Sequence, residues 1–433
     1  MTRTGRKIIF FLLFVAFFLL APTLILYSQG YRWDFEEQRL TQTGGIFLKV
    51  IPKQTRVYVN EKLTKKTDFL FGSVLIENLL PKEYNIQVRK TGFSTWEKNL
   101  QVEEKTVTEA KNVLLFPQSP HFNFIQKEID QLWFSPDGKE AIWKEEAEEE
   151  WALKLYDLNN QLKSHLVTEK DFSRQGAEIK SLEFSPFDRN VSLLCEIEGE
   201  LKSFTLDLGR TPPRITENEE TDQETEIPGP IPSFRHIITY GEQNNNYYYL
   251  DATGTIYRIN ASSLQEEKIA ELPSPVPEIE TGEITFISGF IFLKGGGSFY
   301  QTFPEEKKIE KLSQNFQALK VSPDNKKMAY FSGHEIKVLF LEETDSQPKR
   351  QKGEDIFLVR LSEQIKDLFW LNSEYLIYNS EGGIQIIEID NRDGVNIVKI
   401  AEFQDSQMVW KPEQESVYVY ANQSLWFSQP LLP

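Results

Sequence analysis

The residue types that most often carry out catalysis or bind metals are sparse in this chain of 433 residues. Its four histidines are scattered, and no two have the spacing of a metal-binding pair. They are His121, His165, His236 and His334. The one cysteine, Cys195, excludes an intrachain disulfide and a thiolate cluster for zinc or iron. It follows Leu193 and Leu194 in an apolar stretch, where we expect a buried and unreactive thiol.

Two glycine-containing motifs have the wrong neighbours for catalysis or phosphate binding. The segment Gly92-Phe93-Ser94-Thr95-Trp96 begins like a nucleophile elbow, but a tryptophan stands where the second glycine is required. The run Gly295-Gly296-Gly297 lacks the Lys-Ser/Thr pair and the following helix of a phosphate loop, so it indicates a hairpin turn. We therefore predict no catalytic, metal-binding or cofactor-binding residue and no cofactor, and the sequence identifies no binding residue.

Carboxylates are abundant in this chain, and they are groups that can act in acid–base catalysis or bind Ca²⁺. The chain has 65 Asp and Glu against 48 Lys and Arg, a formal charge of −17, and this sign disfavours a nucleic-acid partner. Two carboxylates could converge in one site, as they do in glycosidases, and sequence spacing alone leaves this open. An acidic loop could also bind Ca²⁺, although no loop of the form D-x-[DN]-x-[DN]-G occurs. A carbohydrate-active enzyme is therefore the alternative to a non-catalytic protein.

An uncharged stretch near the amino terminus predicts a membrane anchor. Residues Ile8 to Leu26 carry no charge and nearly cross a hydrocarbon core of about 30 Å as a helix. A cleaved signal peptide is the alternative, but its apolar region is usually shorter. The three bases that precede the stretch keep the amino terminus in the cytoplasm by the positive-inside rule; they are Arg3, Arg6 and Lys7. We predict a cytoplasmic tail over 1–7, a transmembrane helix over 8–27, and a single-pass cell-membrane protein with the bulk of the chain extracytoplasmic.

The segment 44–116 has the pattern of a small β domain. Alternating apolar runs occur at Ile46–Ile51, Arg56–Val59 and Tyr84–Val88, between turn residues. The segment resembles the PEGA domain of bacterial and archaeal surface proteins in four features: Gly45 to Pro52, Val57-Tyr58-Val59-Asn60, Leu80-Pro81-Lys82-Glu83-Tyr84, and Lys90-Thr91-Gly92-Phe93 followed by Trp96. The resemblance implies a β-sandwich-like module that binds surfaces or acts as a spacer. We expect Tyr58, Phe93 and Trp96 to be core aromatics.

A short unit recurs through 120–433, in which an apolar strand runs into a turn and a second apolar strand follows. Three copies carry Ser-Pro, at Ser135-Pro136, Ser185-Pro186 and Ser322-Pro323. Four more copies, near residues 235, 284, 368 and 409, lack Ser-Pro but keep the same succession of apolar strands. Serine, proline and aspartate favour tight turns, and seven starts give about 45 residues per unit, as in four-stranded blades. This part resembles WD40-like and TolB-type β-propellers. We expect seven blades, with six or eight as alternatives, and His121–Ile125 as the donor of the strand that completes the last blade.

These observations predict an all-β protein with one amino-terminal transmembrane helix, a small PEGA-like β-sandwich and a β-propeller. No catalytic constellation is present in the sequence, and both resembled folds usually bind other molecules. We therefore expect a membrane-anchored extracytoplasmic scaffold, held in the membrane by Ile8 to Leu26, that binds a protein or a cell-envelope glycan and is not an enzyme. A carbohydrate-active propeller enzyme and a purely structural surface spacer are the alternatives.

Overall fold

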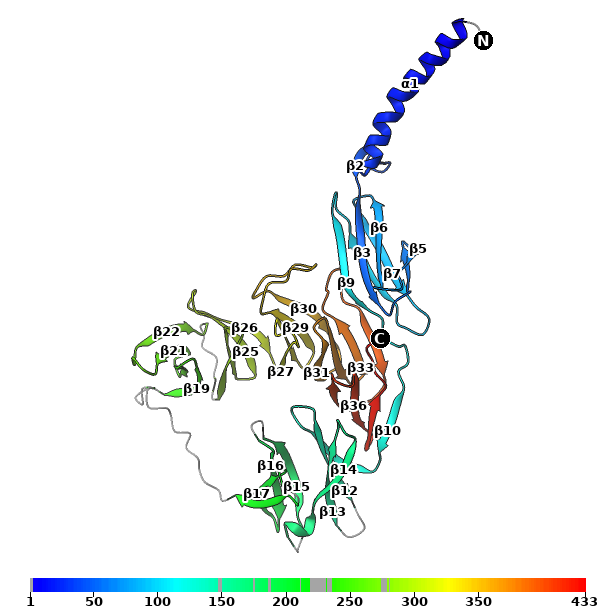
Figure 1. The fold of residues 1–433 in the computed structure, drawn as a ribbon. Helices are drawn as coiled ribbons and strands as arrows, with labels where there is room; N and C mark the ends of the chain where they lie inside the picture. The colour runs from blue at the N-terminus through cyan, green and yellow to red at the C-terminus, as the bar shows by residue number, and fades with distance from the viewer. Residues whose placement is uncertain are drawn as a thin grey trace.

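A computed structural model (Figure 1) describes residues 3–146, 150–173, 176–185, 188–210, 212–218, 231, 236–273, 279 and 281–433. It confirms an all-β chain with one amino-terminal helix, α1 (Arg3–Ser28). The helix is apolar from Gly5 to Ser28 with a mean hydropathy of 2.9, and its large side chains are exposed. It is followed by a two-stranded hairpin of β1 (Tyr31–Asp34) and β2 (Arg39–Gln42).

Two small sheets form a sandwich between the helix and the rest of the chain (Figure 1). One sheet has the order β6-β3-β9 and the other the order β5-β4-β7-β8. The strands are β3 (Gly44–Ile51), β4 (Arg56–Val59), β5 (Lys62–Lys66), β6 (Ser73–Leu79), β7 (Glu83–Arg89), β8 (Trp96–Gln101) and β9 (Val107–Leu114). Alternate residues such as Ile46, Leu48 and Val50 of β3 point into a shared core, which is the period-2 pattern that the sequence shows.

Seven groups of four antiparallel strands follow in the described part of the chain, and we number them as blades 1 to 7. A short parallel pairing of β22 with β26 joins blades 3 and 4 into one eight-stranded sheet. Blade 1 is β11 (Ile129–Phe134), β12 (Glu140–Glu146), β13 (Trp151–Asp157) and β14 (Leu162–Thr168), with a 3-10 turn, η1 (Glu169–Asp171), after it. Blade 2 is β15 (Glu178–Phe184), β16 (Asn190–Ile197), β17 (Glu200–Asp207) and β18 (Arg214–Asn218). Blade 3 is β19 (Ile237–Gln243), β20 (Asn246–Asp251), β21 (Thr255–Asn260) and β22 (Glu266–Glu271). Blade 4 is β23 (Gly282–Ile287), β24 (Phe290–Gly295), β25 (Ser298–Phe303) and β26 (Lys308–Gln314).

Blade 5 is β27 (Phe316–Val321), β28 (Lys327–Ser332), β29 (Glu335–Phe340) and β30 (Asp355–Arg360). Blade 6 is β31 (Ile365–Asn372), β32 (Tyr375–Ser380), β33 (Gly383–Glu388) and β34 (Ile397–Ala401). Blade 7 combines β35 (Gln407–Lys411), β36 (Ser416–Ala421) and β37 (Ser424–Ser428) with β10 (Phe122–Gln126). The order β10-β37-β36-β35 confirms that the segment beginning at His121 completes the last blade.

The recurring serine shapes the turn between the first two strands of a blade. In blade 1 the Ser135 hydroxyl accepts hydrogen bonds from the backbone N–H groups of Lys139 (3.1 Å) and Glu140 (2.9 Å) and donates to the Asp137 carboxylate (2.8 Å). In blade 5 Ser322 donates to Asp324 at 2.6 Å in the same way. Each serine therefore satisfies backbone donors that the tight turn leaves without a strand partner.

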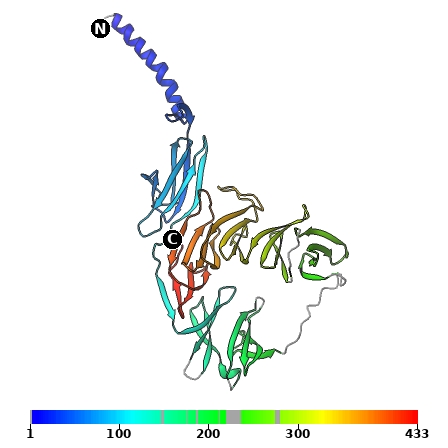
Figure 2. The ribbon, with the colours of Figure 1, turned by 180° about the vertical axis from the view of Figure 1, so that it is seen from behind.

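Neighbouring blades share buried apolar cores, with one exception. Blades 1 and 2, for instance, pack Ile142 and Leu153 against Leu193 and Phe204. Comparable clusters join blades 3 and 4, 4 and 5, 5 and 6, 6 and 7, and 7 and 1. Within the described part of the chain no such cluster joins blades 2 and 3, whose ribbons stand apart in both views (Figures 1 and 2). We call this boundary between blades 2 and 3, which no core of the described residues bridges, the open seam.

Candidate functional site

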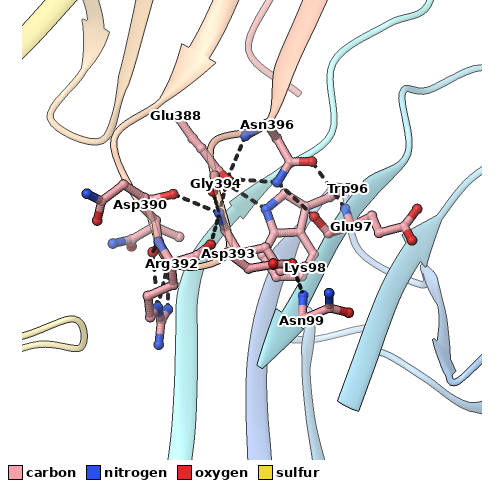
Figure 3. Close-up of polar contacts among 12 residues, drawn as sticks. Trp96, Glu97, Lys98, Asn99, Glu388, Asp390, Arg392, Asp393, Gly394 and Asn396 are labelled. Atoms are coloured by element: carbon pink, nitrogen blue, oxygen red, sulfur yellow. Dashed lines mark hydrogen bonds and ion pairs between the residues drawn. The ribbon is translucent and has the colours of Figure 1, made fainter. Parts of the chain in front are cut away.

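The most densely connected polar cluster joins the sandwich to blade 6 (Figure 3). We call it the joint, and it consists of Trp96, Lys98 and Asn99 from β8 together with Glu388, Asp390, Arg392, Asp393, Gly394 and Asn396 from the end of β33 and the loop that follows. Because the sandwich residues lie almost 300 positions from their partners, the cluster fixes two distant parts of the chain to one another.

Lys98 is the centre of the joint. Its side chain is 1% exposed, and its ammonium nitrogen lies 2.5 Å from Glu388 Oε1. The same nitrogen lies within hydrogen-bond distance of three backbone carbonyl oxygens, those of Asp390 (2.7 Å), Arg392 (2.9 Å) and Gly394 (2.6 Å). A buried ammonium is tolerated only where its charge and its donors are matched, and here both are.

Glu388 is equally well supplied with donors. The Trp96 indole donates to its Oε2 at 2.9 Å, and Asn396 donates to its Oε1 from the backbone (2.9 Å) and from the side-chain amide (2.7 Å). Burial raises the pKa of the Glu388 carboxyl, while Lys98 and these donors act in the opposite direction. Both oxygens are engaged by the protein itself, Oε1 by Lys98 and Asn396 and Oε2 by Trp96, so this carboxylate holds the joint together.

A second set of contacts ties β9 to the same blade. The Tyr375 hydroxyl donates to the Asn112 carbonyl (2.9 Å) and accepts from the Leu114 N–H (3.0 Å). The ring of Phe116, just beyond β9, packs edge-on against Tyr375 with centroids 5.3 Å apart. Phe116 is buried among residues of blades 6 and 7. The sandwich therefore contacts the propeller through both of its sheets.

A different kind of site lies where the first strands of the blades converge. A hollow of 540 Å³ is lined from β11, β15, β27, β31 and β35, and an adjoining hollow of 510 Å³ is lined from β27, β28 and β31. We call the two together the central hollow. Its wall carries aromatic rings and a few charges: Trp133, Phe134, Phe184, Phe369, Glu183, Lys320 and Asp367. Such a surface of rings with sparse polar groups is typical of binding sites.

The charges of the central hollow come from different blades. The Lys320 ammonium of blade 5 lies 5.0 Å from the centre of the Phe369 ring of blade 6, within cation–π range. Burial raises the pKa of the Asp367 carboxyl, and the Met408 N–H, at 3.3 Å, opposes the rise together with the charge of Lys320. The other carboxylate, Glu183 of blade 2, is exposed. The two acids thus share a hollow but do not form a buried pair.

The structure places the residues singled out in the sequence in separate surroundings. Cys195 is buried in the core between blades 1 and 2, and burial raises its pKa to about 11. The triple glycine forms the β24–β25 turn. Among the described residues no three His, Cys, Asp or Glu side chains gather as metal ligands would.

Trp96 is a core aromatic of the sandwich, as expected, and its indole also reaches Glu388. This second role, like the whole joint, was missed by the sequence reasoning. A lysine in the strand pattern Trp96-Glu97-Lys98-Asn99 gives no sign that it is buried against a segment that follows 290 positions later.

No family model matches this sequence, and no curated protein is similar to it. Solved structures that resemble it include YCF48 from Cyanidioschyzon merolae (7% identity, 71% of this chain and 98% of that chain, TM-score 0.37). Another is a chain in a crystal structure of the mitotic checkpoint complex (11% identity, 72% of this chain and 92% of that chain, TM-score 0.38). A third is the Cps50 (Swd1) β-propeller domain of Myceliophteria thermophila (10% identity, 71% of this chain and 99% of that chain, TM-score 0.36). At these scores the assignment of a propeller rests on the strand pairing of the chain itself.

Proposed function

We propose that this protein is a membrane-anchored, non-catalytic interaction scaffold that holds a propeller outside the cytoplasm for a protein or cell-envelope glycan partner. The central hollow carries the proposal. Its aromatic rings offer flat apolar faces that suit an apolar side chain or the face of a sugar ring, and Lys320 and Asp367 at the same wall add directional polar contacts.

The anchor part of the proposal is supported by α1 and its flanks. The helix is long enough to cross a bilayer, and its apolar side chains have no protein surface to cover them in the described structure. Tyr27, Tyr31 and Trp33 follow at the end nearer the sandwich, as expected for an interfacial aromatic belt. The amino terminus would remain in the cytoplasm, and the small sandwich, which resembles a PEGA domain in sequence, would act as the stalk.

The non-catalytic part rests on the chemistry of the hollow. A glycosidase needs two carboxyl groups at a fixed separation, one of them held protonated by its surroundings. Asp367 has a raised pKa, but the other acid, Glu183, is exposed on blade 2, next to the open seam of the propeller. Asp367 and Glu183 therefore do not form the fixed pair of carboxyl groups that would place an acid and a base on either side of a glycosidic bond.

Photocrosslinking tests this function. A photoreactive residue at Gln407, which lines the central hollow and is exposed, should link the full chain in its host membrane to one envelope protein or glycan, and Phe369→Ala should abolish the adduct. The matched control is the same probe at Lys307, an exposed turn residue between β25 and β26, which should give no such adduct.

Two outcomes would contradict the proposal. If the probe at Gln407 gives no adduct that depends on Phe369, the hollow is not the binding surface and a spacer role is favoured. If the purified chain cleaves glycosides and Asp367→Asn stops the cleavage, the protein is a carbohydrate-active enzyme.

A further inference from the structure

A short loop of the sandwich exposes three large apolar side chains in a row. It runs from Thr67 to Gly72 between β5 and β6, and we call it the apolar loop. Phe69, Leu70 and Phe71 are 66%, 57% and 70% exposed. Scattered exposed apolar residues are ordinary, but contiguous ones on a small domain mark a contact surface.

The apolar loop has a fixed shape. The Asp68 carboxylate accepts hydrogen bonds from the N–H groups of Leu70 (2.8 Å), Phe71 (2.6 Å) and Ser73 (2.6 Å), and from the Ser73 hydroxyl (2.5 Å). These donors hold the pKa of Asp68 well below its usual range, so the carboxylate stays charged and keeps the loop folded. A loop ordered in this way presents its side chains without the entropy cost of folding on contact.

Around the apolar loop lies an excess of positive charge that the chain does not neutralise. Six bases on β5 and on the neighbouring strand ends make no ion pair in the part of the chain that the structure describes, and of these Lys62 lies at the end of β5 away from the loop: Lys53, Arg56, Lys62, Lys65, Lys66 and Lys90. Three of them instead donate to nearby backbone carbonyls: Lys53 to Leu70 and Lys65 to Leu75, both at 2.6 Å, and Lys90 to Lys53 at 2.7 Å. In a chain of net charge −17, such a cluster of unpaired cations stands out.

The location of the apolar loop separates it from both the anchor and the joint. The strand β3 begins beside the hairpin that follows α1 and ends beside the loop, where the Val50 N–H donates to Gly72. Its eight residues put the loop about 26 Å further from the anchor. The loop also leaves from β5, the edge of its sheet opposite β8, whose residues form the joint (Figure 1).

We propose that the apolar loop is a second docking surface, which inserts Phe69 and Phe71 into an apolar groove rimmed by carboxylates on another protein. The rings supply the buried area, and the unpaired lysines on β5 select an acidic rim and speed encounter. A second copy of this chain is disfavoured because the like charges around two loops would face each other. The anchoring membrane is disfavoured because the loop lies at the far end of the sandwich.

The test uses the full chain in lipid nanodiscs and a phage-displayed library of random peptides as the probe. Selection should enrich peptides that combine apolar residues with Asp or Glu, and the double variant Phe69→Ala/Phe71→Ala should weaken their binding by about tenfold or more. Lys65→Glu/Lys66→Glu should weaken it also, in a manner that depends on salt. Leu162→Ala and Leu201→Ala, at exposed leucines of the propeller, and Lys307→Glu should leave it unchanged.

Each remaining outcome counts against the proposal. Enrichment of peptides that bind the Phe69→Ala/Phe71→Ala variant equally well would show that the loop is not the docking surface. Loop-dependent sedimentation with vesicles of phosphatidylglycerol and phosphatidylcholine would assign the loop to a lipid surface, and a loop-dependent dimer in sedimentation velocity would assign it to self-association. All substituted side chains are exposed, and an unchanged thermal unfolding transition verifies that each variant is folded.

Discussion

Lys98 and Glu388 form an ion pair that is buried at the boundary between two folds, so each side chain is the counter-ion of the other. Replacing the lysine leaves the carboxylate without its counter-ion and frees three carbonyl oxygens. We expect Lys98→Ala to lower the free energy of unfolding by about 3–5 kcal/mol, the range found when one partner of a buried pair is removed. Chemical denaturation measures this loss.

The control for this prediction is Lys111→Ala, which removes a partly exposed partner of Glu109 and should cost about 0–1 kcal/mol. If the two variants unfold alike, the joint does not hold the sandwich on blade 6. Limited proteolysis near Phe116 offers a second readout, because loosening the joint should expose this link between the two folds.

From the burial of the Asp367 carboxyl we predict that the stability of the folded chain depends on pH. Burial raises its pKa in the folded chain above the value of about 3.9 for an unfolded Asp, so the folded state binds the proton more tightly. The contribution of this carboxyl to stability is therefore largest below that value and is lost as the pH rises through the folded pKa. We expect Asp367→Asn to raise the melting temperature at pH 7 and to leave it nearly unchanged at pH 3.5.

Thermal unfolding across pH 3.5 to 7 measures this effect, and an Asp345→Asn variant, at an exposed loop residue, is the control. A lower melting temperature at pH 7 would mean that the attraction of Lys320 and Lys366 outweighs the burial of the carboxyl. A stabilising substitution that also weakens partner binding would indicate that Asp367 is retained for function at the expense of stability.

Among the elements, β10 has the largest expected influence on the ring, because it is the strand from the start of the propeller that completes the last blade. Its rings Phe122 and Phe124 pack edge-on against Phe403 and Trp426, with centroids 5.0 and 5.2 Å apart. We expect Phe122→Ala/Phe124→Ala to lower the free energy of unfolding by about 2–4 kcal/mol, since each pair adds about 0.5–1.5 kcal/mol to the area that it buries. Denaturant titration measures the loss.

A matched variant at the open seam distinguishes the stability lost by opening the ring from the stability lost by removing any aromatic ring. Tyr247→Ala removes a half-buried ring from the face of blade 3 that lies opposite blade 4, where the described chain forms no core with a neighbouring blade. Its cost should be smaller than that of the β10 variant. An equal or larger cost would mean that blade 3 is supported on that face as firmly as blade 7 is by β10.

The elements could be predicted well because their signals are local. Alternation of apolar residues and the serine turns at Ser135 and Ser322 determine strand starts within a few residues, and repetition reveals the blades. The joint and the open seam could not be predicted, because they depend on which surfaces meet across distances of hundreds of residues. The sequence around Lys98, or in the strands of blade 2, does not indicate which distant segment will lie beside it.

At the scale of the whole molecule, the joint makes the stalk and the propeller one body. The contacts from β8 and β9 to blade 6 connect the central hollow's blades directly to the sandwich. The unpaired lysines beside the apolar loop and the acidic propeller then present two surfaces of opposite charge on one frame. Such a frame could hold two partners at a set distance, which a flexible linker would not do.

We predict that the amino terminus lies in the cytoplasm and the propeller outside it. The single cysteine of the chain allows this topology to be tested by cysteine labelling. Cys195 is buried and its pKa is raised to about 11, so at pH 8 only about one thiol in a thousand is a reactive thiolate. New cysteines can therefore be labelled against a silent background. With an impermeant maleimide on spheroplasts, Ser263→Cys in the exposed β21–β22 turn should react, and Thr4→Cys should react only after the membrane is opened. Labelling of Thr4→Cys on closed spheroplasts, or a mature chain that begins near Ser28, would contradict an uncleaved anchor with a cytoplasmic amino terminus.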